Sequence, residues 1–311
     1  FRTFAINSSH HLTVSGVIGE TNGVQGLIKT GSGTLTLNGA NTYSGTNTIT
    51  GGILAFNSLK NVGGGASALG APTTVENGTI YASARIQYTG GTTTSDRIID
   101  LSGGTGLTFD NLGSGTVTLT GGMTGTTQTV TFRGNANFTV SGLIATGSGA
   151  VNRTDGGTLT LSNDANSFSG GSQISAGTFS IATLADSGVP CALGKGSTIT
   201  LGQHGWNTTG KLQFNGSTGA SCNRALFVET TPGTTTYGGI LENTVAGQAL
   251  RLSGDVSPGS ASATNSPLLQ LAGAGNGELS GVLSGSLILS RNSGAGTWSL
   301  SGVNTYTGAT R

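Results

Sequence analysis

Carboxylates that stand close together are the residues with which this chain could do the most demanding chemistry. Clustered acidic side chains bind calcium, or act as general acid and general base on a glycosidic bond. The sequence has twelve acidic residues, which are scattered apart from Asp155 with Asp164 and Asp96 with Asp100. A spacing of four residues on one strand would put Asp96 and Asp100 on the same face, beside Arg97. We interpret these two as a solvated pair, and we assign no catalytic residue in the sequence.

Histidines are common metal ligands, but their placement here predicts no metal site. His10 and His11 are adjacent, so on a strand they would point to opposite faces and could not share one ion. His204 stands between glutamine and glycine, and we interpret it as an exposed loop histidine. A glycine-rich stretch that begins like a calcium-binding nonapeptide carries Thr108 where aspartate is needed. We therefore expect no metal and no cofactor.

Glycine dominates the composition: 57 of the 311 residues are glycine, and only 8% are charged. Globular proteins average about 7% glycine and about 25% charged residues. Thirteen basic and twelve acidic residues leave a formal charge of +1, which excludes highly charged disorder and offers no basic stripe for nucleic acid. No apolar run reaches about 18 residues, so we expect no membrane insertion by this segment. Few strong helix formers are present, which leaves an all-β chain with many tight turns.

One segment occurs three times, at residues 31–45, 156–170 and 294–308. In each copy apolar residues alternate with threonine or serine, a turn rich in glycine or asparagine follows, and then comes a single aromatic residue. That pattern predicts strand, turn and strand. Arg85–Tyr88 also matches residues 211–214 at an offset of 126. The chain is therefore predicted to hold a little over two copies of one long unit, at about residues 1–126, 127–265 and 266–311.

Stacked coils account for this repeat better than separate domains do. Tandem sandwich domains would need a linker, and no proline-rich, charged or low-complexity joint separates the copies. Short strands and glycine or asparagine turns recur instead about every 8–12 residues. A coil cannot bury its apolar face alone, whereas stacked coils build one narrow core, here of modest aliphatic side chains. We predict one continuous parallel β-helix, a β-solenoid of about 13–15 coils over residues 1–311, at roughly 20–25 residues a coil.

The first copy closely resembles the autotransporter-associated β-strand repeat. The resemblance rests on residues 27–37, 41–45 and 49–54. The second copy matches through residues 174–179 without the leading lysine, and in the third the match breaks off at Arg311. This repeat is found in passenger regions of bacterial autotransporters and in other very large secreted surface proteins. It implies secretion and a right-handed β-helix, and it brings no catalytic residues with it.

Two cysteines stand where the first copy has serines. Cys191 aligns with Ser67, and Cys222 aligns with Ser95. In a secreted protein, as the resemblance implies, this joint change predicts one disulfide between neighbouring coils. The alternative is two unpaired, small buried residues.

One aromatic residue occupies the same position in each motif copy: Tyr43, Phe168 and Tyr306. These rings could form binding platforms along one face, or they could close a coil corner over the core. Because phenylalanine fills the position in one copy, the position needs no hydroxyl. We therefore assign all three a structural role.

These observations favour a non-enzymatic extracellular segment, structural or adhesive, such as a surface stalk, a fibre or an autotransporter-like passenger on the bacterial cell surface. The alternative is a glycan-binding or glycan-degrading β-helix enzyme, a lyase or a hydrolase, which would need an acidic or basic cluster on one face. Host or environmental glycans and neighbouring cells are the partner classes that remain open. Nucleic acid is not expected among them.

Both ends of the sequence resemble its interior. Phe4 and Ile6 match Val130 and Phe132, and residues 297–310 form an ordinary motif copy. Solenoids usually carry capping elements, because open strand edges template further strands. We therefore expect the chain to be part of a longer protein that continues the solenoid, or to associate end to end. Sedimentation at rising concentration tests the second expectation, and a strictly monomeric, folded chain would count against it.

Overall fold

The computed structural model describes residues 1–231, 233, 235–259, 265–291 and 293–311. The chain falls into two compact units, unit 1 (Phe1–Gly149) and unit 2 (Ala150–Arg311). Strands dominate both units, and the one helix of the described residues, α1 (Val75–Gly78), is four residues long. Strand pairing within each unit is parallel. The predicted parallel β-solenoid is thus confirmed. No helix in this described part is long and apolar enough to cross a membrane.

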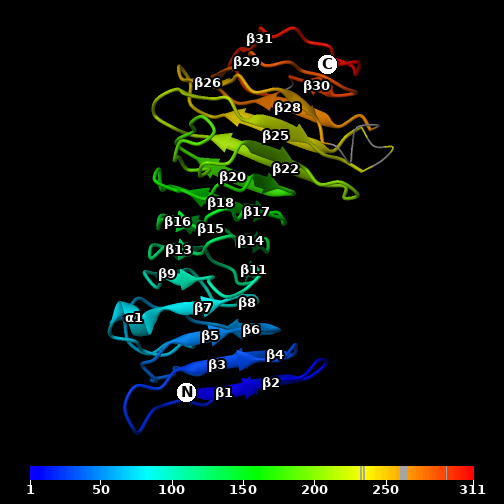
Figure 1. Ribbon diagram of the computed structural model, residues 1–311. Coiled ribbons are helices and arrows are strands. Elements are labelled where there is room, and N and C mark those ends of the chain that lie inside the picture. Colours follow the sequence, from blue (N-terminus) through cyan, green and yellow to red (C-terminus); the bar gives the residue numbers. More distant parts are fainter. Residues whose placement is uncertain (232, 234, 260–264, 292) are drawn as a thin grey trace. The chain divides into compact units, whose positions relative to one another are not determined.

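Unit 1 contains three groups of paired strands, and Figure 1 shows its strands stacked in sequence order. The first sheet has the order β1 (Arg2–Ala5), β3 (Leu27–Thr30), β5 (Asn47–Ile49), β7 (Ile80–Ala82), β10 (Ile99–Asp100), β13 (Met123–Thr124), β16 (Ile144–Ala145). The second has β2 (His11–Val14), β4 (Thr34–Leu37), β6 (Ile53–Phe56), β8 (Arg85–Tyr88), β11 (Gly106–Asn111), β14 (Thr129–Arg133). The third has β9 (Thr93–Ser95), β12 (Val117–Leu119), β15 (Phe138–Val140).

Unit 2 also contains three groups. Its first sheet has the order β17 (Val151–Arg153), β19 (Ser172–Ile174), β21 (Thr198–Leu201), β24 (Ala225–Val228), β27 (Val256–Pro258). The second has β18 (Thr158–Leu161), β20 (Gly177–Ile181), β22 (Thr209–Phe214), β25 (Gly238–Asn243), β28 (Leu268–Ala272), β30 (Ile288–Ser290). The third has β23 (Ala220–Cys222), β26 (Ala249–Leu252), β29 (Asn276–Leu279), β31 (Trp298–Leu300).

The two units repeat one pairing plan. The order β3-β5-β7-β10-β13 in unit 1 corresponds to β17-β19-β21-β24-β27 in unit 2, and β4-β6-β8-β11-β14 corresponds to β18-β20-β22-β25-β28. Counted within each unit, the longest run of neighbouring strands has seven members in unit 1 and six in unit 2. The described residues therefore make about thirteen coils, the lower end of the predicted range. The predicted boundaries between repeat copies stay a prediction.

The core of each unit is a stack of inward side chains in register. One buried row of unit 1 crosses five strands of the second sheet: Leu35, Leu54, Ile86, Phe109 and Phe132. Leu12 on β2 continues this row in register and is 39% exposed. Aromatic rings continue it, because Phe138 lies edge-on to Phe109 and Phe132 with ring centres 5.1 and 4.9 Å apart. The expectation of modest aliphatic side chains is therefore wrong for this part of the core. The coils are wide enough here for three rings to meet.

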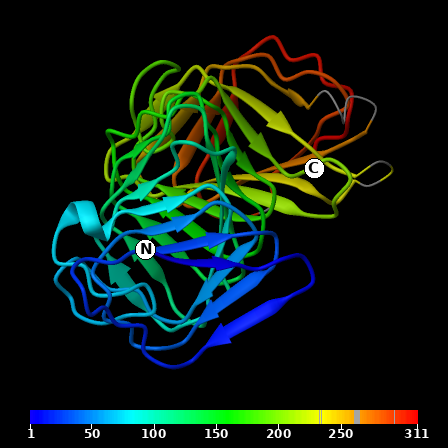
Figure 2. The same ribbon diagram turned by 60° about the horizontal axis from the view of Figure 1, so that its bottom comes forward.

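A long coil in unit 1 carries the helix. Asn47 and Ile80 are register partners 33 positions apart, and α1 lies within this coil. Thr74 caps the helix by accepting a hydrogen bond from the backbone N–H of Asn77 at 3.3 Å. Figure 2 shows α1 at the side of unit 1, outside the stacked strands. The longer coil thus adds material to the surface and leaves the sheet register intact.

Candidate functional site

The carboxylates of Asp96 and Asp100 do not form a paired site. Asp96 lies in the corner between β9 and β10, so the expectation that both share one strand is wrong. The chain turns there because Arg97 points into the core, where it is 2% exposed. Asp96 Oδ1 accepts from the backbone N–H of Val62, and Asp100 Oδ1 from that of Ser102, each at 2.7 Å. Both carboxylates therefore fix loops.

The other acid and histidine candidates are also loop and surface groups. Asp164 Oδ1 accepts from the Thr183 hydroxyl at 2.6 Å. His10 precedes β2, which begins at His11, and His204 is exposed in a loop. Within the described ranges, no three His, Cys, Asp or Glu side chains gather as metal ligands would.

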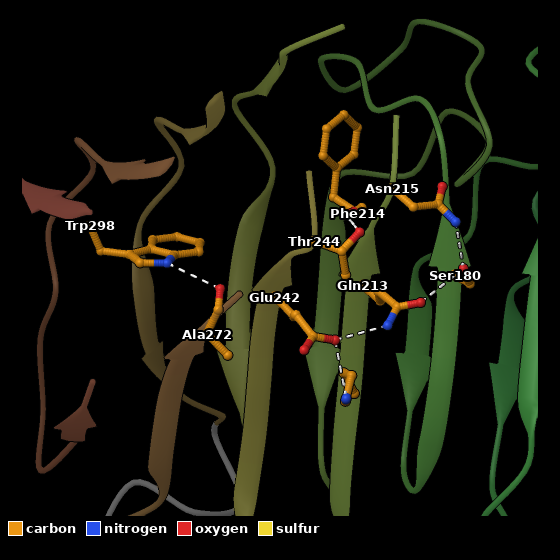
Figure 3. A network of polar contacts seen from close by, with 9 residues as sticks. Ser180, Gln213, Phe214, Asn215, Glu242, Thr244, Ala272 and Trp298 are labelled. Atoms are coloured by element: carbon orange, nitrogen blue, oxygen red, sulfur yellow. Dashed lines mark hydrogen bonds and ion pairs between the residues drawn. The ribbon is translucent and has the colours of Figure 1, made fainter. Parts of the chain in front are cut away.

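Unit 2 carries a ladder of polar side chains across its second sheet (Figure 3). Lys211 Nζ donates to Glu242 Oε2 at 3.1 Å, and Gln213 Nε2 donates to the same oxygen at 2.9 Å. Gln213 Oε1 accepts from the Ser180 hydroxyl at 3.2 Å, and the Ser180 oxygen accepts from Asn215 at 2.9 Å. Glu242 stands opposite Gln213 in the register of β22 and β25. The parallel register therefore brings side chains of three coils into one hydrogen-bonded row.

Unit 1 has the same arrangement on β8 and β11. Arg85 Nε donates to Asp110 Oδ2 at 2.6 Å, and Gln87 Nε2 donates to that oxygen at 2.8 Å. Arg133 Nε lies 3.9 Å from the other oxygen of the carboxylate. Asp110 stands opposite Gln87 in the register. We call these two clusters the base–glutamine–acid triads: Arg85, Gln87 and Asp110 in unit 1, and Lys211, Gln213 and Glu242 in unit 2.

The triads join neighbouring coils. Asp110 is fully buried, so its carboxylate depends on the donors around it. The side chains of Lys211 and Glu242 are 29% and 20% exposed, so water screens this pair more and it contributes less to stability. The sequence match between Arg85–Tyr88 and residues 211–214 aligned the base and the glutamine of the two units, but only as a mark of the repeat. It missed the acids, because Asp110 follows its base by 25 positions and Glu242 by 31.

A cation recurs near the start of each motif copy. Lys29 is buried, and its Nζ donates to three backbone carbonyls at 2.8, 2.9 and 3.2 Å. Arg153 takes this place in unit 2 and donates to the Gly157 carbonyl at 3.1 Å, while Arg291 donates to that of Gly294 at 2.9 Å. Burial lowers the pKa of Lys29, and it lowers the pKa of Arg153 to about 10. The second copy therefore keeps a cation where its leading lysine is missing.

Two further arginines, Arg97 and Arg224, lie in the core at 2% and 1% exposure. Arg97 Nη1 donates to the Leu69 carbonyl at 2.7 Å, and Arg224 Nη1 donates to the corresponding Leu193 carbonyl at 2.9 Å. Arg224 also reaches the carbonyls of Ala185 at 2.9 Å and Gly194 at 2.7 Å. Burial lowers the pKa of Arg97 to about 10. Each guanidinium satisfies carbonyls that the corner would otherwise bury without a partner.

The motif aromatics lie against glycines of the next coil. Tyr43 and Phe168 are 1% and 0% exposed. A Cβ added to Gly70 or Gly194 would come within 2.8 Å of the respective ring, and both glycines have a left-handed φ, +81° and +63°. Rings that close a coil corner over the core must be buried in this way. Tyr306 is half-buried, and its hydroxyl lies 2.6 Å from that of Thr310.

The two cysteines lie at the corner that Arg224 fills. Both are buried free thiols in this structure. Arg224 Nη2 donates to Cys191 Sγ at 3.2 Å, and Cys191 donates to the carbonyl three residues on at 3.3 Å, as the Ser67 hydroxyl does at 2.8 Å. Burial raises the pKa of the Cys222 thiol to about 11, and the nearby Cys191 acts in the same direction. The disulfide between them stays a prediction.

We expect the chain to carry the Cys191–Cys222 disulfide when it is exported to an oxidising compartment. The measurement is the mass after unfolding and alkylation, with and without prior reduction. Unfolding comes first because a buried thiol with a pKa of about 11 reacts slowly near neutral pH. Alkyl groups should add only after reduction, and the Cys222→Ser variant should alkylate at Cys191 without it. Two alkyl groups on the unreduced, unfolded chain would contradict the disulfide.

The described surface also has shallow hollows. One of about 340 Å³ in unit 1 is lined by Ser83, Thr108 and Thr131 among others. One of about 250 Å³ in unit 2 contains Arg251 and Glu278, whose side chains pair at 3.3 Å. A third, of about 390 Å³, lies beside α1 in unit 1. Their lining supplies hydroxyl, amide and charged groups, which can hold a polar partner in a fixed orientation.

Comparison with known proteins identifies the repeat. The passenger-associated-transport-repeat family matches residues 27–56, 151–181 and 293–311. The first two segments cover β3 to β6 and β17 to β20, which are corresponding strands of the two units. The chain is also 34% identical over 185 residues to the adhesin BmaC autotransporter of Brucella suis biovar 1 (strain 1330). The alignment spans 59% of this chain and 5% of that relative. No solved structure matches.

These similarities confirm that the chain carries autotransporter-type passenger repeats. They indicate an extracellular or cell-surface location, as the sequence predicted.

Proposed function

We propose that this chain is a non-enzymatic, adhesive segment of an extracellular passenger. The observation that carries the proposal is the similarity to an autotransporter adhesin over 185 residues. The three matches to the passenger-associated-transport-repeat family support it.

The use of the buried charges supports the same function. Lys29, Arg97 and Arg224 donate to backbone carbonyls, and Asp110 accepts from side chains of its own sheet. A general acid or nucleophile must instead present its reactive atom to a substrate. These buried charged side chains therefore stabilise the coils. Binding of a partner is left to the outward faces of the sheets. Repeated faces allow several weak contacts at once, which raises avidity without a deep pocket.

The proposed partners are glycans or the surfaces of neighbouring cells. The test uses beads coated with the purified chain, on cultured cells and on immobilised glycans, together with a reducing-end assay on the same glycans in solution. We expect the beads to be retained above beads coated with an unrelated β-solenoid, and no new reducing ends to appear. Release of reducing ends at a steady rate would instead support the alternative, a glycan-degrading enzyme.

A further inference from the structure

The hollow beside α1 gathers exposed apolar side chains in a way that the coil does not need. Val24 is 58% exposed and Tyr81 37%, and both line this space of about 390 Å³. Large apolar groups exposed together on a soluble surface mark a recognition site more often than single ones do. Glu76 and Asn77 of α1 line the same hollow.

The sheet register and the helix build this hollow. Thr48 on β5 stands opposite Tyr81 on β7, and both point outward because their neighbours Asn47 and Ile80 are buried. The N-cap at Thr74 starts α1 immediately before β7, so Glu76 and Asn77 come next to the strand that carries the ring. An aromatic side chain, a hydroxyl, an amide and a carboxylate therefore converge from three elements.

The corresponding coil of unit 2 shows which side chains the sheet needs at the positions of Thr48 and Tyr81. There Gln173 on β19 stands opposite Thr200 on β21, the register partners that correspond to Thr48 and Tyr81. No helix occurs in the described part of that coil. Two small or polar side chains thus suffice for the sheet. The exposed ring and α1 are additions of unit 1.

The polar groups of the hollow are available for a ligand. Within the described part of the chain, the side chains of Glu76, Asn77 and Tyr81 make no hydrogen bond to another residue. A ring that offers an apolar face, with carboxylate and amide groups at its edge, matches a pyranose, which has C–H bonds on its faces and hydroxyls around its rim. Glu76 is the one charged side chain in the lining, so the hollow repels acidic sugars.

We propose that this hollow binds an uncharged saccharide unit, which stacks on Tyr81 and donates hydroxyl hydrogen bonds to Glu76 and Asn77. The inference rests on the proposed adhesive function and names the ligand class of one site. It places that site on unit 1, between α1 and the outward face of its first sheet.

The test measures binding of the whole chain to immobilised neutral oligosaccharides (glucan, galactan, mannan and chitin oligomers) beside uronate and sulfated oligosaccharides. We expect retention on at least one neutral set. The Tyr81→Ala variant should bind that set about tenfold more weakly, while Tyr81→Phe, which keeps the ring, should stay near wild type. Asn77→Ala should also weaken binding. Thr200→Ala, the matched outward position of unit 2, should leave binding unchanged, and the unfolding midpoint of every variant should stay near wild type.

Several outcomes would overturn the proposal. Neutral oligosaccharides that bind equally to wild type and Tyr81→Ala would exclude the hollow as their site. Retention on acidic oligosaccharides or on cell-surface protein alone would exclude the ligand class while leaving adhesion in place. Failure to adhere to any cell or glycan would overturn the adhesive function itself, and the saccharide site with it.

Discussion

Replacing Arg224 with leucine should lower the free energy of unfolding of unit 2 by about 3–5 kcal/mol. The change removes donors from the carbonyls of Ala185, Leu193 and Gly194, which lie 2.7–2.9 Å from the guanidinium. A buried carbonyl left without a partner costs about 1–3 kcal/mol, and leucine cannot reach these oxygens. The corner that also holds the two cysteines should therefore loosen first.

The matched control is Arg251→Leu, because Arg251 lies in the same unit and pairs with Glu278 at 60% side-chain exposure. An exposed ion pair contributes about 0–1 kcal/mol, so this variant should unfold close to wild type. Tryptophan fluorescence in urea reports on unit 2, which contains both tryptophans, Trp206 and Trp298. Equal urea midpoints for the two variants would show that Arg224 has no special structural role.

Truncating Phe138 to alanine should destabilise unit 1 by about 3–5 kcal/mol. Its ring is fully buried and lies between those of Phe109 and Phe132. The change removes buried apolar surface and two edge-on ring contacts, and close-packed coils cannot collapse fully into the space. Phe109 and Phe132 on the second sheet would lose their contact with the third sheet, which carries Phe138.

Hydrogen exchange is the suitable measurement here, because unit 1 has no tryptophan and stacked coils can open locally. Amides of β11, β12, β14 and β15 should exchange much faster in Phe138→Ala than in the wild type. The control is Leu143→Ala, at a 43% exposed position of the same unit. It should change the opening free energies obtained from exchange by under about 0.5 kcal/mol. Unchanged protection in β11 and β14 would mean that the aromatic cluster does not hold these coils.

The repeat and its strands could be predicted because alternation and turn residues are local signals. Tyr43 and Phe168 stand at one motif position, and the structure buries both against glycines of the next coil. The sequence did not predict that cations such as Lys29 point into the core, because a charged residue in a polar stretch is expected to face solvent. A signal was present: Lys29 shares the inward parity of Leu27, and the residues on either side of it are less buried.

Pairings between coils could not be predicted from one sequence. Asp110 and Glu242 complete equivalent triads at different distances along the chain, since the coils between them differ in length. The error at Asp96 and Asp100 has a related cause. The alternation of residue types along a strand does not reveal where the chain turns a corner. Here the corner, with the buried Arg97, lies between Asp96 and Asp100.

The measurement that tests the adhesive account most directly is the gain of adhesion when this chain is displayed on a non-adherent bacterium. Adherent cells are counted on host cell layers and on immobilised glycans, against the same bacterium displaying an unrelated β-solenoid at equal density. The account predicts a clear rise in adherent bacteria for the chain, by multivalent contact of its outward faces. No rise at equal display, together with release of reducing ends from a glycan by the soluble chain, would contradict it.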